Sequence, residues 1–213
     1  MVLSQQSSAG LDLIALFGRG GFVMWPLLFC SLLAVAGILD RGFFFLFRLR
    51  YRLTTVLDRI QSAVGAEVPA KALGDGDDPP TRLARLYLEN LDATTEHRRN
   101  VIQRQAGHDL HRAERRVGML SAIAALSPLI GLLGTVWGMV EAFATIETLE
   151  QVKPADVAGG IWSALLTTVF GLCVAIPAVA ATRWAEGRIE TLARDLNLVI
   201  SHLDDWTGRV TQR

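Results

Sequence analysis

Charged residues are absent from three long stretches of this 213-residue chain, at positions 20–39, 117–140 and 157–182. The stretches contain 20, 24 and 26 residues, and about 20 apolar residues suffice for a helix to cross a bilayer. Hydropathy and length together identify such runs as membrane spans. The sequence therefore predicts an all-α membrane protein with three transmembrane helices.

Cysteine and histidine are also scarce, with two and four residues respectively. Cys30 and Cys173 fall in different uncharged stretches, where a free cysteine packs as a small apolar residue. His108 and His111 stand three positions apart in a segment rich in arginine, which would repel a metal cation. We therefore expect no disulfide framework, no metal site and no bound cofactor.

Motifs of soluble enzymes are missing as well. Glycines precede Thr135, as they do in phosphate-binding loops, but this segment lies in a predicted span and has no lysine to meet a phosphate. The arginines between positions 98 and 116 alternate with acidic residues and adjoin a span. Such a cluster fits lipid headgroups better than nucleic acid. We expect contact with membrane lipid, no catalytic residues and no nucleic-acid binding.

Basic residues are distributed unevenly between the predicted spans. Of the 21 lysines and arginines, 13 lie at positions 48–116 and five at 183–213. The positive-inside rule places both of these segments in the cytoplasm. The predicted order is an outer segment at 1–21, a first span at 22–47, a cytoplasmic helical region at 48–116, a second span at 117–143, an outer loop at 144–156, a third span at 157–182 and a cytoplasmic C-terminal helix at 183–213.

The two cytoplasmic segments have helical patterns. Asp78 followed by Pro79 is typical of a helix cap and a first helical residue. From Thr81 no proline occurs until Pro128, which predicts one helix that runs from the cytoplasm into the second span. In the C-terminal segment, apolar residues recur every four and three positions, at Ala185, Ile189, Leu192, Leu196, Val199, Leu203 and Trp206. This stripe predicts helix packing, either within one subunit or between subunits.

Small residues interrupt the second and third spans. Glycines and prolines, which shape close contacts between membrane helices, occur at Pro128, Gly131, Gly134, Gly138, Gly171 and Pro177. Lipid-facing helices need no such pattern. The two spans are therefore predicted to pack closely against other helices.

Two threonines stand at similar depth in these spans. At ~1.5 Å per residue, Thr135 and Thr168 lie roughly 12–17 Å below the outer end of their helices. Each shares a helix face with small residues, so the two faces could line a narrow cavity in which the hydroxyls are exposed. Alternatively, the hydroxyls bond back to the preceding turn and the small residues only pack helices together.

Three motifs resemble a known family. They are GGFVMWPLL at 20–28, followed by the acid–arginine pair Asp40–Arg41, then SPLIGLLGTVWGM at 127–139, and GIWSALLTT at 160–168 with its continuation to Ala178. In this order they resemble the three membrane spans of the ExbB/TolQ/MotA proton-channel family. With three predicted spans rather than four, the chain resembles the ExbB/TolQ branch of the family, and ExbB above all.

The resemblance implies a subunit of a proton-driven motor in the bacterial inner membrane, with its N-terminus in the periplasm and its C-terminus in the cytoplasm. Five copies would form a pentamer whose second and third spans line a pore. That pore would enclose an ExbD- or TolR-like single-span partner, whose membrane aspartate takes up and releases protons. The motion would be passed to a periplasmic effector of the TonB or TolA type, which energises outer-membrane transport. The coupling ion would be the proton.

The resemblance also assigns roles to individual residues. Thr135 and Thr168 match the pore-lining threonines of the family, and Thr167 stands beside them. Many members have a glutamate in the third span where this chain has Ser163, so Glu141 is a candidate for an acid near the pore entrance. Other functions remain open, namely a TolQ-like or gliding-type stator subunit, or a membrane scaffold that conducts no protons.

Overall fold

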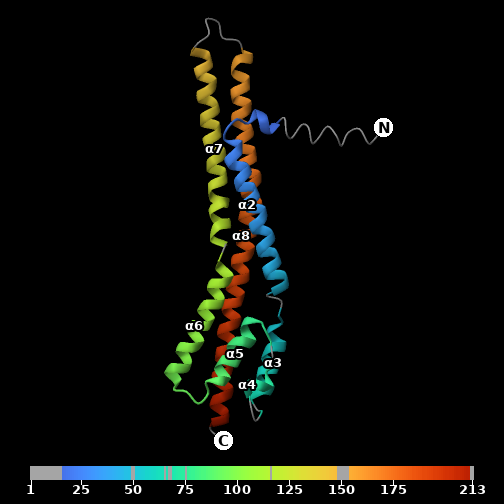
Figure 1. The fold of residues 1–213 in the computed structure, drawn as a ribbon, viewed down its shortest axis with the longest axis vertical. Coiled ribbons are helices and arrows are strands. Elements are labelled where there is room, and N and C mark those ends of the chain that lie inside the picture. The colour runs from blue at the N-terminus through green and yellow to red at the C-terminus, as the bar shows by residue number, and fades with distance from the viewer. Residues whose placement is uncertain are drawn as a thin grey trace, which may run out of the picture. The chain divides into compact units, whose positions relative to one another are not determined.

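The computed structural model describes residues 16–48, 51–64, 66, 69–74, 76–115, 117–147 and 154–211. Every regular element in these ranges is a helix (Figure 1). In chain order the elements are α2 (Met24–Phe43), a π-helical turn (Phe44–Arg48), α3 (Leu53–Val64), α4 (Pro69–Ala72), α5 (Pro79–Glu89), α6 (Thr95–Glu114), α7 (Val117–Glu147) and α8 (Pro154–Thr211).

Three helical stretches are long and apolar enough to cross a membrane. They are Met24–Leu46, Thr95–Glu147, which joins α6 and α7, and Val157–Gly208. The first is a single span in length, whereas the second and third are far longer than a bilayer requires. The predicted fold class, an all-α membrane protein with long second and third helices, is confirmed.

The chain divides into two compact units. The first unit comprises Met1–Leu39 and Gly118–Thr182, and in its described part α2, α7 and α8 pack side by side (Figure 1). Its buried apolar contacts come from all three helices, through Ala34, Leu120, Ile123, Ala124 and Ala178. Many large apolar side chains of this unit point outward, among them Phe29, Leu132 and Leu165, as expected of surfaces that face lipid or other membrane helices.

The second unit comprises Asp40–Val117 and Arg183–Arg213. Its core contains residues of α3, α5, α6 and α8, including Ile60, Leu83 and Ile102. The heptad-like stripe of α8 joins this core, since Leu192, Leu196, Val199 and Leu203 are all buried there. The stripe therefore packs within one chain, which is one of the two arrangements that its spacing predicted.

The single helix predicted from Thr81 into the second span is wrong. Helix α5 ends at Glu89, and α6 starts after Thr94, whose hydroxyl accepts the backbone N–H of His97 at 3.3 Å. Helix α6 ends at Glu114, because Arg115 has a non-helical ψ of 129°. Proline is not needed for the break between α5 and α6, since the side chains of Asn90 and Thr94 bond to backbone groups of the two helix ends. The predicted cap of α5 is confirmed, because the Asp78 carboxylate accepts the N–H of Thr81 at 3.0 Å.

Candidate proton pathway

The glycines of the second and third spans lie where α7 and α8 touch. A methyl group added to Gly131 would come within 2.9 Å of the backbone oxygen of Thr167. One added to Gly138 would come within 3.0 Å of the backbone oxygen of Gly160, and one added to Gly134 within 2.6 Å of Thr167 Cβ. Side chains therefore cannot replace these hydrogens while the two backbones stay in place. The two helices approach closely at these glycines within one chain, and the role of the glycines in packing around a pore stays a prediction.

Both prolines lie inside the helices of this contact, Pro128 in α7 and Pro177 in α8. Next to Pro128, the Ser127 hydroxyl is buried and donates to the carbonyl of Ile123 at 2.7 Å. The Ser127 carbonyl faces α8 so closely that a methyl on Gly171 would lie 2.7 Å from it. The proline turn of α7 is thus in direct backbone contact with α8.

Three threonines gather around the Gly131 turn. Thr167 Oγ1 lies 2.7 Å from the carbonyl of Ala164 in its own helix and 3.2 Å from the carbonyl of Gly131 in α7. Thr168 Oγ1 donates to the same Gly131 carbonyl at 3.3 Å. Thr135, one turn after Gly131, donates to the carbonyl of its own helix at Leu132, at 2.7 Å. The bonds of Thr167 and Thr168 to the Gly131 carbonyl cross between the two helices, whereas the Thr135 bond stays within α7.

The three hydroxyls differ in exposure. Thr167 is 1% exposed, whereas Thr135 and Thr168 are only partly buried. The small residues that share their helix faces are buried, at Gly131, Gly138, Ala142, Ala164, Gly171 and Ala175, and all but Ala175 have a described contact between α7 and α8. Within one chain, the small residues therefore pack the helices, and the Thr135 hydroxyl bonds back as the second alternative expects. Thr135 and Thr168 still reach the surface of the unit, so their role as pore-lining residues stays a prediction.

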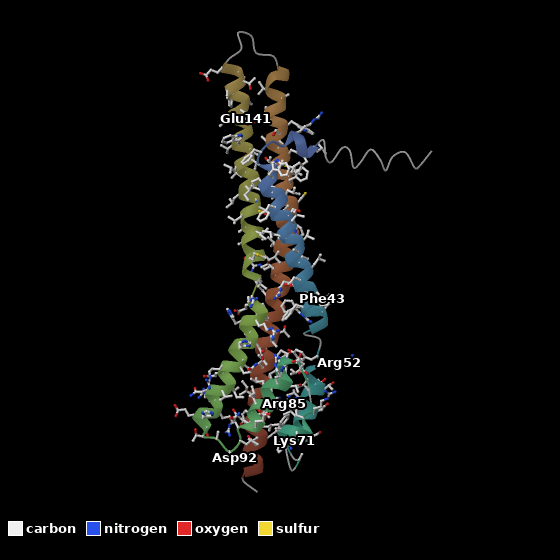
Figure 2. All side chains as sticks on the ribbon, viewed as in Figure 1. Phe43, Arg52, Lys71, Arg85, Asp92 and Glu141 are labelled. Carbon is white, nitrogen blue, oxygen red and sulfur yellow. The ribbon has the colours of Figure 1, made fainter. Side chains whose placement is uncertain are left out.

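Ser163 and Glu141 lie away from this group. Ser163 is partly buried. It lies near the start of α2, since a methyl group added to Gly21 would be 3.9 Å from the Ser163 hydroxyl oxygen. It precedes Thr168 by five positions, which corresponds to about 140° of rotation around α8. Glu141 is exposed on α7 and accepts the indole N–H of Trp137 at 2.7 Å (Figure 2). Neither residue joins the threonines in the described structure.

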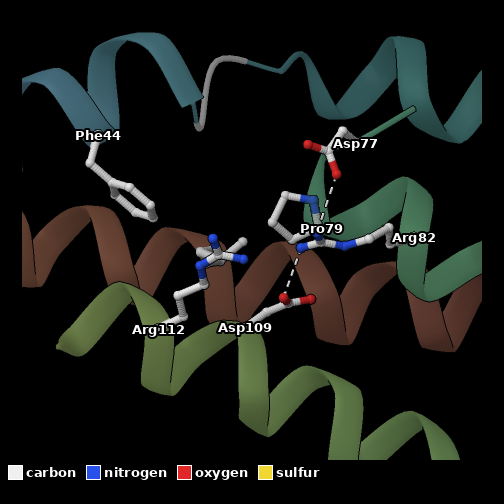
Figure 3. A pocket seen from close by; sticks show the side chains of 7 residues that line it. Phe44, Asp77, Pro79, Arg82, Asp109 and Arg112 are labelled. Carbon is white, nitrogen blue, oxygen red and sulfur yellow. Dashed lines mark hydrogen bonds and ion pairs between the residues drawn. The ribbon is translucent and has the colours of Figure 1, made fainter. Parts of the chain in front are cut away.

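The second unit holds a buried ion pair that sequence reasoning missed. Arg82 of α5 donates to the Asp109 carboxylate of α6 at 2.8 Å (Figure 3). Gln105 donates to the same carboxylate at 3.1 Å. A second Arg82 nitrogen reaches Asp77 at 3.3 Å, beside a small cavity that Phe44 and Arg112 also line. The sequence signal was weak, since Asp109 is one acid in an arginine-rich helix and its partner lies 27 positions away.

We expect Asp109→Ala to destabilise the second unit. The Asp109 side chain is 2% exposed, so its loss leaves Arg82 without its buried partner. Breaking a buried pair costs about 3–5 kcal/mol, and the lower end applies because Arg82 is itself 30% exposed. Thermal unfolding of the detergent-solubilised protein measures the loss. Asp77→Ala is the matched control, because Asp77 is 83% exposed and its pair contributes about 0–1 kcal/mol. Equal effects of the two variants would contradict the buried pair's role.

The chain's two tyrosines both bond to acidic residues of α8. Tyr51 donates to Asp195 at 2.8 Å, and Tyr87 donates to Asp204 while touching Thr207. Burial, and then the hydrogen bond to Asp195, raises the pKa of Tyr51 above its ordinary range. Burial and the bond to Asp204 raise the pKa of Tyr87 in the same way.

These pKa shifts predict a loss of stability in alkali. The unfolded chain releases its tyrosine protons near pH ~10, whereas the folded chain still holds them there. The stability contribution is therefore complete below pH ~10 and is lost as the pH rises toward the folded pKa values. When thermal unfolding is measured between pH 8 and 11, the unfolding midpoint of the wild-type protein should decline above pH 10. The decline should be flatter in the double variant Tyr51→Phe with Tyr87→Phe. An unchanged slope in this double variant would show that the decline has another cause.

The fold and this site define a polytopic α-helical membrane protein with hydroxyl groups gathered at a close contact of two spans. A family model described as the MotA/TolQ/ExbB proton channel family matches residues 76–197, more than half of the chain. The chain belongs to this family, on its ExbB/TolQ branch.

Individual relatives agree with the family match. The biopolymer transport protein exbB1 of Vibrio cholerae serotype O1 is 30% identical over 209 residues, which cover 88% of this chain and 86% of the relative. The Tol-Pal system protein TolQ of Haemophilus influenzae is 37% identical over 99 residues, or 46% of this chain and 42% of the relative. The biopolymer transport protein ExbB of Neisseria gonorrhoeae is 43% identical over 84 residues, 39% of this chain and 38% of the relative.

Proposed function

We propose that this chain is the ExbB-like subunit of a proton-driven motor in the inner membrane of a bacterium. Five copies surround a single-span partner of the ExbD or TolR type, which carries a membrane aspartate. The proton is the coupling ion, and the motor energises a periplasmic effector of the TonB or TolA type for outer-membrane transport. The subunit is a transducer and not an enzyme, and it needs no cofactor.

One structural observation supports this proposal above the others. Thr135 and Thr168 are partly exposed hydroxyl groups, and both lie beside the Gly131 turn at the close contact of two candidate spans. In a family described as proton channels, such hydroxyls are suited to meet a partner's carboxylate. They are neutral donors, so they add no charge to the membrane.

The chemistry follows from the balance between two states of that carboxylate. Low-dielectric surroundings favour its protonated form, and hydrogen bonds from threonine hydroxyls favour its ionised form. A partner aspartate that moves toward and away from Thr135 and Thr168 would therefore release a proton in one position and bind one in the other. Relative motion of the helices is the way in which proton flow does work.

The decisive experiment is reconstitution with the co-purifying partner. We expect a single-span protein with a membrane aspartate to purify with this chain, and vesicles that contain the complex to pass protons down an imposed gradient. Replacement of the partner's aspartate by asparagine should stop this flow. A stable complex that passes no protons under any gradient would instead support a scaffold that uses the glycine contact for assembly alone.

The proposed orientation leads to a labelling prediction. In a variant without Cys30 and Cys173, a cysteine at Ala72 or Gly208 should escape an impermeant maleimide applied to spheroplasts, because both positions are exposed on segments assigned to the cytoplasm. A cysteine at Ala144, exposed near the outer end of α7, should react and serves as the control. Efficient labelling at Ala72 or Gly208 would contradict the orientation.

A further inference from the structure

Thr167 is the most deeply buried of the three threonines, and its position depends on one glycine. A methyl on Gly134 would have its three closest neighbours in the Thr167 side chain, at Oγ1, Cβ and Cγ2. The missing side chain at Gly134 is therefore the space that Thr167 occupies. Its hydroxyl, shared between Ala164 and Gly131, then sits next to the Thr168 hydroxyl on the same Gly131 carbonyl.

We propose that Thr167 is a positioning residue of the proton pathway and that it acts through Thr168. Thr167 fixes α8 against the Gly131–Gly134 turn of α7, and its hydroxyl, which bonds to Ala164, also donates a hydrogen bond to the Gly131 carbonyl at 3.2 Å. That leaves the longer and weaker bond of Thr168 free to exchange its acceptor for a partner's carboxylate. The assignment rests on the function proposed above, and it separates two adjacent threonines that the sequence places together in the pathway.

The surroundings of Thr167 and Thr168 contain few other groups that could set the pKa of a partner's carboxylate. Residues 20–39 of the α2 segment and 157–182 of α8 carry no charge, and neither do residues 117–140 of α7. The nearest acid along α7 is Glu141, which bonds to Trp137. Hydroxyl hydrogen bonds are therefore the main polar contacts that these helices offer at this depth.

The proposed packing of Thr167 against Gly134 is tested by adding a methyl group at position 134 and removing the side chain at position 167. Gly134→Ala should lower the thermal midpoint of the purified complex and reduce its yield. Gly118→Ala on the same helix has open space around it and should change neither. Thr167→Gly combined with Gly134→Ala removes all three clashing atoms and should recover at least half of the loss. A double variant no better than Gly134→Ala alone would refute the pairing.

The functional half is tested by the pH dependence of proton flow in vesicles that contain the whole complex. Thr167→Val keeps the volume but leaves the Gly131 carbonyl to Thr168 alone, so Thr168 is less available to the partner. The half-maximal pH should move upward by about 0.4 units, the equivalent of one average interhelical hydrogen bond. Thr168→Val should move it in the same direction, and Thr167→Ser should leave it at the wild-type value.

The double variant Thr167→Val with Thr168→Val identifies the route. If Thr167 acts through Thr168, the double variant shifts no further than Thr168→Val. Additive shifts, or a shift with Thr168→Val and none with Thr167→Val, would overturn the positioning role while the proposed function stands. If the wild-type complex itself passes no protons, the proposed function has failed. If Thr167→Val does not assemble, Thr167→Ser and Thr167→Ala are compared instead. They differ in the hydroxyl group, and both side chains are smaller than threonine.

Discussion

Thr135→Val combined with Thr168→Val should leave insertion and oligomer size normal and should abolish activity that depends on the proton gradient. Valine is close in shape to threonine, so the packing is kept. Among the described residues the Thr135 hydroxyl bonds within its own helix alone, and the Thr168 bond to Gly131 is long at 3.3 Å. Neutral hydrogen bonds between membrane helices contribute only ~0.6 kcal/mol on average, so the fold tolerates their loss. A partner carboxylate would nevertheless lose the donors that stabilise its ionised form.

Proton flow in vesicles and growth that requires outer-membrane transport measure this loss. Ser163→Ala is the matched control, because it also removes a hydroxyl from α8 but lies near the start of α2, about 140° around the helix from Thr168. We expect a milder effect from it. Full proton-linked activity in the Thr135→Val/Thr168→Val variant would exclude the role proposed for the two hydroxyls.

The membrane part of the fold could be predicted from the sequence because the physical demand is simple. The bilayer sets the length of an apolar helix, and charge inside it is costly, so three uncharged runs were enough to find the candidate spans. Glycines that would weaken a soluble helix also indicated close packing, and Gly131, Gly134 and Gly138 lie in a close contact between α7 and α8.

The breaks in the second unit could not be predicted in the same way, because they depend on contacts that are distant in sequence. Arg41, next to the first span, donates to the carbonyl of Ala113 at 3.2 Å, 72 positions later. A free carbonyl near the end of α6 is thereby satisfied, just before Arg115 leaves the helical conformation. Only the folded chain brings this guanidinium to that helix end.

The candidate site was predicted in part. Sequence spacing placed Thr135 and Thr168 at one depth, and the structure brings both to the Gly131 turn. It could not show that Thr167, rather than Thr168, fills the gap at Gly134, because one position along a helix changes the direction of a side chain by about 100°. Which face meets the neighbouring helix is decided by the rotation of α8, and only packing fixes that rotation.

Gly171→Leu should prevent assembly of the complex altogether. A first side-chain carbon at this position would lie 2.7 Å from the carbonyl oxygen of Ser127 and 3.1 Å from the Cα of Gly131. Both neighbours are backbone atoms, so no rotamer change can make room and the two helices must separate. Overpacking of this kind costs about 1–3 kcal/mol for small additions and more for larger ones. Separation would also withdraw the Gly131 carbonyl from both Thr167 and Thr168.

A graded series of substitutions distinguishes this steric clash at Gly171 from a general intolerance of larger side chains in α8. Gly171→Ala should already be harmful, although alanine favours a helix by about 1 kcal/mol over glycine. Gly159→Ala and Gly159→Leu, in the same helix with open space around the added atoms, should assemble at wild-type size. Size-exclusion chromatography of the solubilised complex reads out each variant. If Gly171→Leu gave a complex of normal size that retained its partner, the close contact of α7 and α8 would not be what holds the spans together. Equal losses from the Gly159 and Gly171 substitutions would point to contacts between subunits, because of these two glycines only Gly171 lies against the backbone of α7 in the described part of the chain.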